Sequence, residues 1–198
     1  MKVAVVRYNA GNTGSVTNAL RRLGIEPEVT SEAEKLWSAD RVIFPGVGEA
    51  STAMRSLRDT GLDRVIPSLR QPVLGICLGM HLLCESSEEN STECLGIISA
   101  KVREFHLTGL KVPHIGWNTI DRLSGPLFEG VAEGEHVYFV HGFYVEDRAE
   151  ASARSEYGVT FTAALEKDNF HAAQFHPEKS GSVGERILGN FIGSKEMK

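Results

Sequence analysis

The stretch that decides the fold of this chain is Gln71-Pro72-Val73-Leu74-Gly75-Ile76-Cys77-Leu78-Gly79-Met80. An apolar, strand-like run leads into Gly-x-Cys-x-Gly, and a helical pattern follows. This order predicts a sharp strand-to-helix turn that carries Cys77, with glycines on both sides where bulk would clash. Unpaired N–H groups and the positive end of the helix dipole favour a thiolate there. Cys77 is therefore a candidate nucleophile, although a buried cysteine in an ordinary turn fits these residues equally well.

A second motif lies far downstream and reads Gln174-Phe175-His176-Pro177-Glu178-Lys179-Ser180. Pro177 biases His176 toward an extended backbone, so the side chains of His176 and Glu178 project to the same side. A carboxylate placed there can accept from one imidazole nitrogen and leave the other facing a thiol. A surface histidine beside a solvated glutamate is the alternative, which the cysteine turn in the same chain disfavours. We therefore expect a triad of Cys77, His176 and Glu178.

The rest of the first half predicts alternating strands and helices, which is typical of a parallel sheet covered on both faces. The expected strands are residues 2–6, 25–29, 41–44 and the run before Cys77, and the expected helices are residues 16–23, 51–57 and the run after Cys77. Thr13 or Ser15 can cap the first helix, and Gly24 suits its end. Ligand sites in such sheets lie beyond the carboxyl ends of the strands.

Beyond Leu95 the apolar runs become short and closely spaced, which indicates antiparallel strands. The expected strands are residues 95–98, 102–105, 111–115, 136–145 and 160–165, followed by a last helix at 183–192 and preceded by a polar loop at 85–93. We expect an α/β fold with a mostly parallel central sheet and an antiparallel extension in the C-terminal half. No linker interrupts the chain, so residues 1–198 should form one domain.

Composition limits the possible functions. The chain has 198 residues, a formal charge of -5 and three cysteines, without a basic stripe, so a nucleic-acid partner is not expected. Neither a signal sequence nor a membrane-spanning run is recognisable. A reactive thiol requires a reducing compartment, so the expected location is the cytoplasm. Cys84 on the helix after Cys77 and Cys94 at a strand start suit the core, and a metal site is not expected.

Together these motifs resemble the class I (triad) glutamine amidotransferases, and Phe44-Pro45-Gly46-Val47-Gly48 belongs to the same likeness. More narrowly, Val112-Pro113-His114-Ile115-Gly116-Trp117-Asn118 and Tyr138-Phe139-Val140-His141-Gly142-Phe143-Tyr144 resemble the glutaminase subunits of imidazole glycerol phosphate synthases, which serve histidine biosynthesis. The likeness covers essentially the whole chain. It implies a three-layer α/β/α, flavodoxin-like fold.

The resemblance also implies the reaction. Glutamine would be hydrolysed to glutamate and ammonia through a Cys77 thioester, without a cofactor. The ammonia would pass to a separate cyclase, which is a (βα)₈ barrel that forms a heterodimer with this chain. The products would be imidazole glycerol phosphate and an aminoimidazole carboxamide ribonucleotide.

By position in the family, several further residues gain expected roles. The oxyanion would be held by the N–H groups of Leu78 and Val47, although Pro45 to Gly48 alone could be a simple tight turn. The expected substrate contacts are Gly46, Gly48, His81, Glu89, Gly142 and Phe143. The expected partner face comprises Asn12, Trp117, Asn118, Tyr138 and Lys179.

Two departures from the family pattern bear on glutamine binding. His81 stands where relatives usually have Gln; it can donate one hydrogen bond in its place, or simply pack. Gly142 and Phe143 stand where relatives usually have Ser or Thr and then Tyr, so two hydroxyls are missing, and Glu89 has a second acid, Glu88, beside it.

Three other functions compete with this interpretation. A sister glutaminase, such as the one serving pyridoxal phosphate synthesis, would usually carry Pro-Gly-Gly-Glu-Ser where this chain has Val47. A stand-alone cysteine hydrolase would place its histidine soon after the cysteine. A noncatalytic binding subunit would be expected to lack a triad residue.

Overall fold

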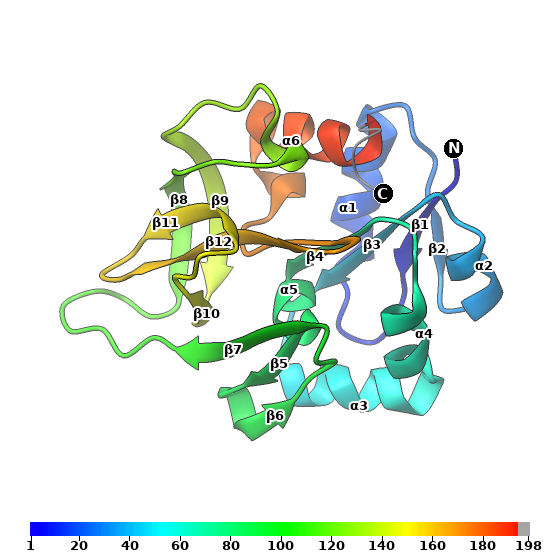
Figure 1. Cartoon of the computed structure of the whole chain (residues 1–198), viewed down its shortest axis with the longest axis horizontal. Coiled ribbons are helices and arrows are strands. Elements are labelled where there is room, and N and C mark those ends of the chain that lie inside the picture. The colour runs from blue at the N-terminus through cyan, green and yellow to red at the C-terminus, as the bar shows by residue number, and fades with distance from the viewer. Residues whose placement is uncertain (194–198) are drawn as a thin grey trace.

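The computed structural model describes residues 1–193 and has three layers, α/β/α (Figure 1). The main sheet has the strand order β2-β1-β3-β4-β13-β12-β10-β7-β5-β6, with β11 added beside β12. Its strands are β1 (Val3–Val6), β2 (Glu28–Thr30), β3 (Arg41–Gly46), β4 (Val73–Cys77), β5 (Cys84–Ser87), β6 (Thr92–Glu93), β7 (Ile98–Glu104), β10 (Phe143–Glu146), β11 (Ala151–Glu156), β12 (Thr160–Lys167) and β13 (Phe170–Ala173). A separate two-stranded ribbon joins β8 (His114–Ile120) to β9 (Glu135–His141).

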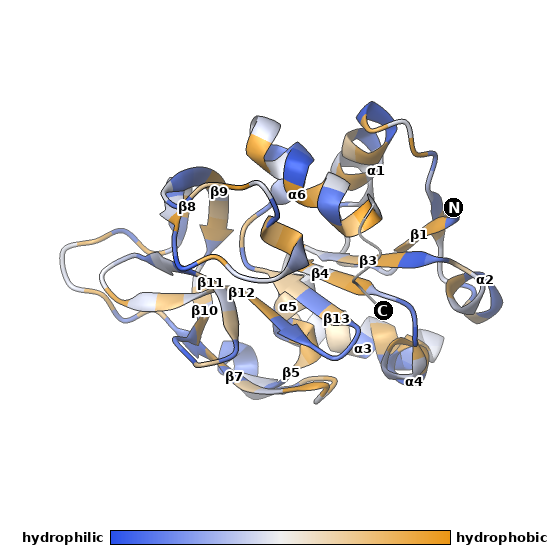
Figure 2. Ribbon diagram, turned by 45° about the horizontal axis from the view of Figure 1, so that its top comes forward, coloured by the Kyte–Doolittle hydropathy of each residue, from blue (hydrophilic) through white to orange (hydrophobic). Residues whose placement is uncertain are grey.

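Six helices cover the two faces of the sheet within the described residues. They are α1 (Thr13–Arg22), α2 (Ala33–Trp37), α3 (Ala50–Thr60), α4 (Leu62–Ser68), α5 (Leu78–Leu83) and α6 (Gly181–Gly193), with short 3-10 turns at Glu89–Ser91, Pro126–Phe128 and Pro177–Lys179. Helices α1 and α6 pack into one core cluster, and α2 to α5 pack into a second on the opposite face. Figure 2 shows hydrophobic residues on central strands such as β1 and β4 and hydrophilic ones on outer helix surfaces.

The parallel part of the sheet brings the active-site motifs to one edge. β3, β4 and β13 are adjacent and parallel, with Gly46 of β3 beside Cys77 of β4 and Ala173 of β13 beside Ile76. These strands are buried along almost their whole length, which explains their continuous apolar runs. The carboxyl ends of the three strands therefore carry Pro45–Gly48, Cys77 and His176 to one place.

The predicted antiparallel extension is confirmed for β12, which pairs antiparallel with β10, β11 and β13. The ribbon of β8 and β9 lies at the same end of the molecule (Figure 1). Its buried residues Ile120, Val137 and Phe139 join the core cluster of α1 and α6, so the ribbon is fixed to the main body by apolar packing.

Several local predictions were wrong. α1 is capped by neither Thr13 nor Ser15, because the Asn12 side chain accepts from the Ser15 N–H; Gly24 does adopt the predicted left-handed conformation. α2 and α4 were not predicted, since each is short and lacks a clear period. Residues 25–29 were predicted as one strand, but β2 begins only at Glu28.

The C-terminal half differs in similar ways. The polar run 85–93 is not a loop but contains β5 and β6. Cys84 ends α5 and begins β5 rather than lying on the helix face, and Cys94 follows β6 rather than starting a strand; both are buried as expected. The single strand expected at 136–145 is divided at Gly142 into β9 and β10.

Candidate active site

Cys77 lies on the sharp turn that the sequence predicted between β4 and α5. Its backbone has φ 53° and ψ -109°, and residues other than glycine rarely adopt a positive φ. A Cβ on Gly79 would come within 2.0 Å of the Phe44 carbonyl oxygen, and one on Gly75 within 2.7 Å of Leu83 Cδ1. The glycines therefore let α5 approach the sheet closely enough to hold Cys77 in this strained turn.

His176 and Glu178 form the expected charge-assisted hydrogen bond. His176 Nδ1 lies 2.8 Å from Glu178 Oε1, and both side chains are almost fully buried. The His176 N–H donates to the Tyr138 carbonyl at 2.9 Å, and Ser180 Oγ donates to the His176 carbonyl at 2.6 Å. These bonds fix the backbone around the imidazole and leave Nε2 as its unpaired nitrogen.

The electrostatics of His176 couple it to Cys77. Nε2 makes no hydrogen bond of normal geometry within the described residues, yet it lies near enough to Cys77 to feel its charge. Burial disfavours the imidazolium, but the Cys77 thiolate and the Glu178 carboxylate outweigh burial and raise the pKa of His176 above its ordinary value. The arrangement therefore favours the protonated form of His176 beside Cys77.

A cavity of about 580 Å³ opens over the thiol. Its lining residues are Val47, Gly48, Cys77, Leu78, His81, Glu89, Glu104, Val112, Pro113, Val140, His141, Gly142, Phe143, His176 and Lys179. The cavity therefore joins the triad to the Pro45–Gly48 loop and to the junction of β9 and β10. A small polar molecule can reach the sulfur from this side.

The two expected oxyanion donors are arranged differently. Leu78 is the first residue of α5, where backbone N–H groups have no partner inside the helix. The Val47 N–H instead donates to the Ala10 carbonyl at 2.6 Å. It therefore points away from the cavity, contrary to the expectation. The Tyr8 hydroxyl donates to the Pro45 carbonyl at 2.8 Å in the same buried corner. The loop after β1 thus holds the Pro45–Gly48 loop at two points.

The expected substrate contacts divide into two groups. Gly48, His81, Glu89, Gly142 and Phe143 line the cavity. Gly46 is packed instead, because a Cβ there would lie 2.7 Å from both the Gly79 nitrogen and Leu78 Cβ.

The two neighbouring acids separate clearly in the structure. Glu89 accepts from the Ala50 N–H at 2.7 Å at the start of α3, and burial raises its pKa. Glu88 is turned toward Arg103, with a 2.7 Å contact, and accepts from the Glu104 N–H at 2.8 Å. Of these two neighbouring acids, Glu89 is therefore the one that faces the cavity.

His81 is buried and hydrogen bonded, with Nε2 2.7 Å from Oε1 of Gln174. Burial lowers the pKa of His81 to about 4, so the ring is neutral near pH 7. Gln174 also lies beside the nucleophile, with its Nε2 3.9 Å from Cys77 Sγ. Gln174 was not predicted as a site residue; its position two residues before His176 is the signal that could have identified it.

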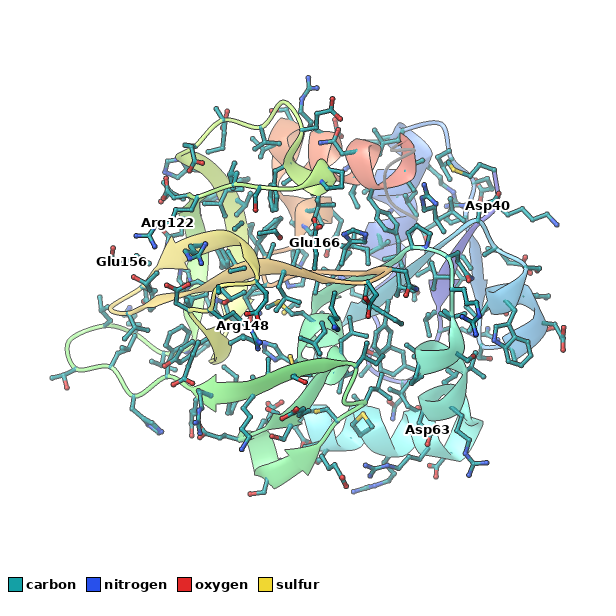
Figure 3. All side chains as sticks on the ribbon, viewed as in Figure 1. Asp40, Asp63, Arg122, Arg148, Glu156 and Glu166 are labelled. Atoms are coloured by element: carbon teal, nitrogen blue, oxygen red, sulfur yellow. The ribbon has the colours of Figure 1, made fainter. Side chains whose placement is uncertain are left out.

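Three of the expected partner-face residues lie together. Trp117 and Tyr138 are paired across β8 and β9 with ring centroids 6.0 Å apart, and Lys179 Nζ lies 5.9 Å from the Tyr138 ring. Asn118 is next to Trp117, and its amide donates to the carbonyl of Glu156, at the outer end of the strand-rich half (Figure 3). The Asn12 side chain caps the N-terminus of α1, where it accepts a hydrogen bond from the Ser15 N–H.

This face also carries exposed apolar side chains. Trp117 is 56% exposed and Ile115 is 60% exposed, both on β8. Neighbouring exposed apolar residues mark surfaces that bind other proteins. Among residues 1–193, no group of three or more His, Cys, Asp or Glu side chains is arranged to hold a metal ion, and no helix is long and apolar enough to span a membrane.

The class of protein follows from similarity to a protein family and to a solved structure. The family model for glutamine amidotransferase class-I matches residues 4–193. A solved crystal structure of a glutamine amidotransferase shares the fold, with a TM-score of 0.75 at 23% identity over 97% of this chain and 97% of that one. The chain belongs to the class-I glutamine amidotransferase family.

Its relatives within that family are more specific. A protein of Bacteroides thetaiotaomicron named imidazole glycerol phosphate synthase subunit HisH is 57% identical over 194 residues, covering 97% of this chain and 99% of the relative. A Haemophilus influenzae protein of the same name is 43% identical over 193 residues, covering 97% of each. Both similarities extend over nearly the full length of the chains compared.

Proposed function

We propose that this chain is the glutaminase subunit of an imidazole glycerol phosphate synthase. The observation that carries the chemistry is the placement of His176, hydrogen bonded to Glu178 and next to Cys77 at the base of an open cavity. The full-length similarity to HisH subunits supports the choice of synthase. The thiol chemistry requires a reducing compartment, so we place the protein in the cytoplasm.

The proposed first half-reaction releases ammonia. The Cys77 thiolate attacks the side-chain amide carbon of glutamine, and the developing oxyanion is held by the Leu78 N–H and a second backbone donor. The C–N bond then breaks while the His176 imidazolium gives its proton to the departing amine, which leaves as ammonia. Cys77 is left as a glutamyl thioester and His176 as a neutral base.

The second half-reaction restores the thiolate. Neutral His176 removes a proton from water, which attacks the thioester carbon. The C–S bond breaks, glutamate leaves, and the thiolate–imidazolium pair forms again. Glu178 holds the same imidazole nitrogen throughout, so the other nitrogen always faces the reacting atoms. The chain needs no cofactor for these steps.

Ammonia release alone does not make the synthase product, so the proposal includes a second subunit. The partner is a (βα)₈ cyclase that takes up the ammonia and forms imidazole glycerol phosphate and an aminoimidazole carboxamide ribonucleotide. The exposed apolar residues of β8 and the group of Trp117, Tyr138 and Lys179 suit its docking surface. Lys179 also lines the cavity, so a partner bound there would contact the active-site wall directly.

The proposal is tested by measuring glutamine hydrolysis in three mixtures. These contain the purified glutaminase chain, the same chain with the cyclase, and both proteins with the ribonucleotide ligand. We expect the rate to rise at each step. An isolated chain that is fully active and unchanged by both additions would favour an independent amidase.

Two further measurements separate the competing functions. A sister glutaminase would respond to a different synthase subunit, and it would not support formation of imidazole glycerol phosphate with the cyclase. A noncatalytic binding subunit would neither hydrolyse glutamine nor be labelled at Cys77 by a glutamine-like electrophile.

A further inference from the structure

Gln174 occupies an unusual position beside the triad. It directly follows β13, its N–H donates to the Ala163 carbonyl at 2.8 Å, and its side chain is fully buried. Gln174 Nε2 lies 3.9 Å from Cys77 Sγ, and His176 lies close enough to Cys77 for their charges to interact, so both side chains point toward the thiol. The thiol is therefore approached by a base and by an amide from one short segment.

The two ends of the Gln174 amide have different partners. Oε1 lies 2.7 Å from His81 Nε2, and Nε2 lies 3.9 Å from Cys77 Sγ. An amide oxygen can only accept, so the hydrogen of the first bond must be on His81 Nε2. Burial keeps the His81 ring neutral, and one proton on Nε2 satisfies this requirement. The amide then presents its NH₂ group to the sulfur.

This orientation matters because the sulfur needs donors when it is ionised. As a thiol, Cys77 can donate to the Val140 carbonyl, which lies 3.8 Å away. A thiolate cannot donate, so it depends on groups that donate to it. The described structure supplies two such groups, the Gln174 amide and His176. A flipped amide would instead direct its oxygen at the sulfur and repel the thiolate.

We propose that Gln174 is a positioning residue for the nucleophile, held in the productive orientation by the hydrogen bond from His81. This inference rests on the proposed function, because it assigns the two residues a role in the same glutaminase reaction. A glutamine at position 81 can donate to Gln174 Oε1 as well, so either residue preserves the orientation of the amide.

The test compares three single variants of the complex with cyclase. Gln174→Met removes the donor while keeping a side chain of similar length, His81→Leu removes the group that orients the amide, and His81→Gln keeps a donor. Two rates are measured at one fixed pH: the alkylation of Cys77 by iodoacetamide, and glutamine hydrolysis resolved into kcat and KM. Alkylation needs no glutamine turnover, so it reports on Gln174 even if the proposed function is wrong.

Hydrogen bonds to charged groups set the size of the expected effect. Gln174→Met should lower both the alkylation rate and kcat by about ten- to a hundredfold, with KM changed less than about twofold. His81→Leu should lower the same two rates, and it should add little in a Gln174→Met background because it acts through Gln174. His81→Gln should remain within about twofold of the parent.

Controls separate positioning from folding. Thermal unfolding shows whether each variant folds, and co-elution with the cyclase shows whether it docks. Gln71→Met removes another side-chain amide, which donates to the Leu36 carbonyl away from the thiol, and it should leave alkylation unchanged. Unchanged alkylation and kcat in folded Gln174→Met would overturn the proposal, as would a raised KM with kcat unaltered, which would make these residues substrate contacts instead.

Discussion

The backbone N–H of Val47 donates a hydrogen bond to the carbonyl of Ala10 at 2.6 Å. Val47 lines the cavity, but its N–H is therefore turned away from the place where the oxyanion would form. The N–H can reach the cavity only if the peptide between Gly46 and Val47 turns over. Such a turn changes ψ of Gly46 and φ of Val47 together. Val47 is not among the residues with positive φ, so the turned-over state would give this β-branched residue an unfavourable positive φ.

Glycine at position 47 should therefore make the isolated chain more active. Val47→Gly removes the strain of the turned-over state, about 1–3 kcal/mol, so partner-independent glutamine hydrolysis should rise by roughly five- to a hundredfold. The measurement is the steady-state rate of the glutaminase chain without cyclase. Val47→Ala is the control, because alanine still disfavours positive φ and should rise much less. A Val47→Gly variant whose isolated chain is no more active than the parent would argue against the idea that this peptide must turn over before the oxyanion can be held.

Replacing the nucleophile should remove the glutamine-dependent activity of the synthase and leave its ammonia-dependent activity. Cys77→Ser should abolish glutamine-dependent synthesis and leave ammonia-dependent synthesis by the complex nearly intact, because the cyclase does not need the thiol when ammonia is supplied. Both activities are measured on the same preparation. Glutamine-dependent turnover within tenfold of the parent, a barrier change of about 1.4 kcal/mol, would remove Cys77 from its assigned role. Labelling of Cys84 or Cys94 by a glutamine-like electrophile would do the same.

The sequence predicted the parts of the site that depend on local geometry. The turn at Cys77 needs glycine on both sides, and the spacing of His176 and Glu178 fixes which way their side chains project; both relations are visible in a few consecutive residues. The hydrogen bonds of Val47 and Gln174 were not predictable in this way. Each joins segments far apart in the chain, Val47 to Ala10 and Gln174 to His81, and no local pattern encodes such a pairing.

The same distinction applies to the fold. The long, fully buried strands and α6 were predicted because burial on both faces, or a clear helical period, marks them in the sequence. The short elements were missed for physical reasons. β5 carries Glu85 on an exposed position and pairs with β7, so its strand conformation depends on a distant neighbour rather than on its own residues.

Close packing of α5 against β3 predicts a severe effect at Gly79. A methyl group there would meet the Phe44 carbonyl oxygen at 2.0 Å, and this oxygen belongs to backbone in the centre of the sheet. Gly79→Ala should therefore lower the free energy of unfolding by about 3 kcal/mol or more and displace Cys77. Gly189→Ala is the matched control in α6, where the added methyl meets nothing within 4 Å. It should be neutral or stabilise by up to about 1 kcal/mol, as measured by urea unfolding, and similar losses in both variants would contradict the packing argument.

Buried neutral histidines should make the protein sensitive to mild acid. Burial lowers the pKa of His141 to about 3 and the pKa values of His81 and His114 to about 4. An unfolded chain takes up these protons near pH 6.5 while the folded chain does not, so stability is complete above about pH 6.5 and falls as pH decreases toward the folded values. His176 acts in the opposite direction: its raised pKa contributes stability that is complete below about pH 6.5 and is lost as pH rises, so it offsets only a small part of the acid loss.

At pH 5 each of the three buried histidines should cost about 1–2 kcal/mol of unfolding free energy relative to pH 7. The measurement is the urea midpoint at both pH values. His141→Asn should be less stable at pH 7, because its contacts with His114 and the Phe143 carbonyl change, but its loss between pH 7 and pH 5 should be smaller than that of the parent. His106→Asn replaces an exposed histidine and should keep the full loss. An equal acid loss in His141→Asn and the parent would show that other groups control the acid response of this fold.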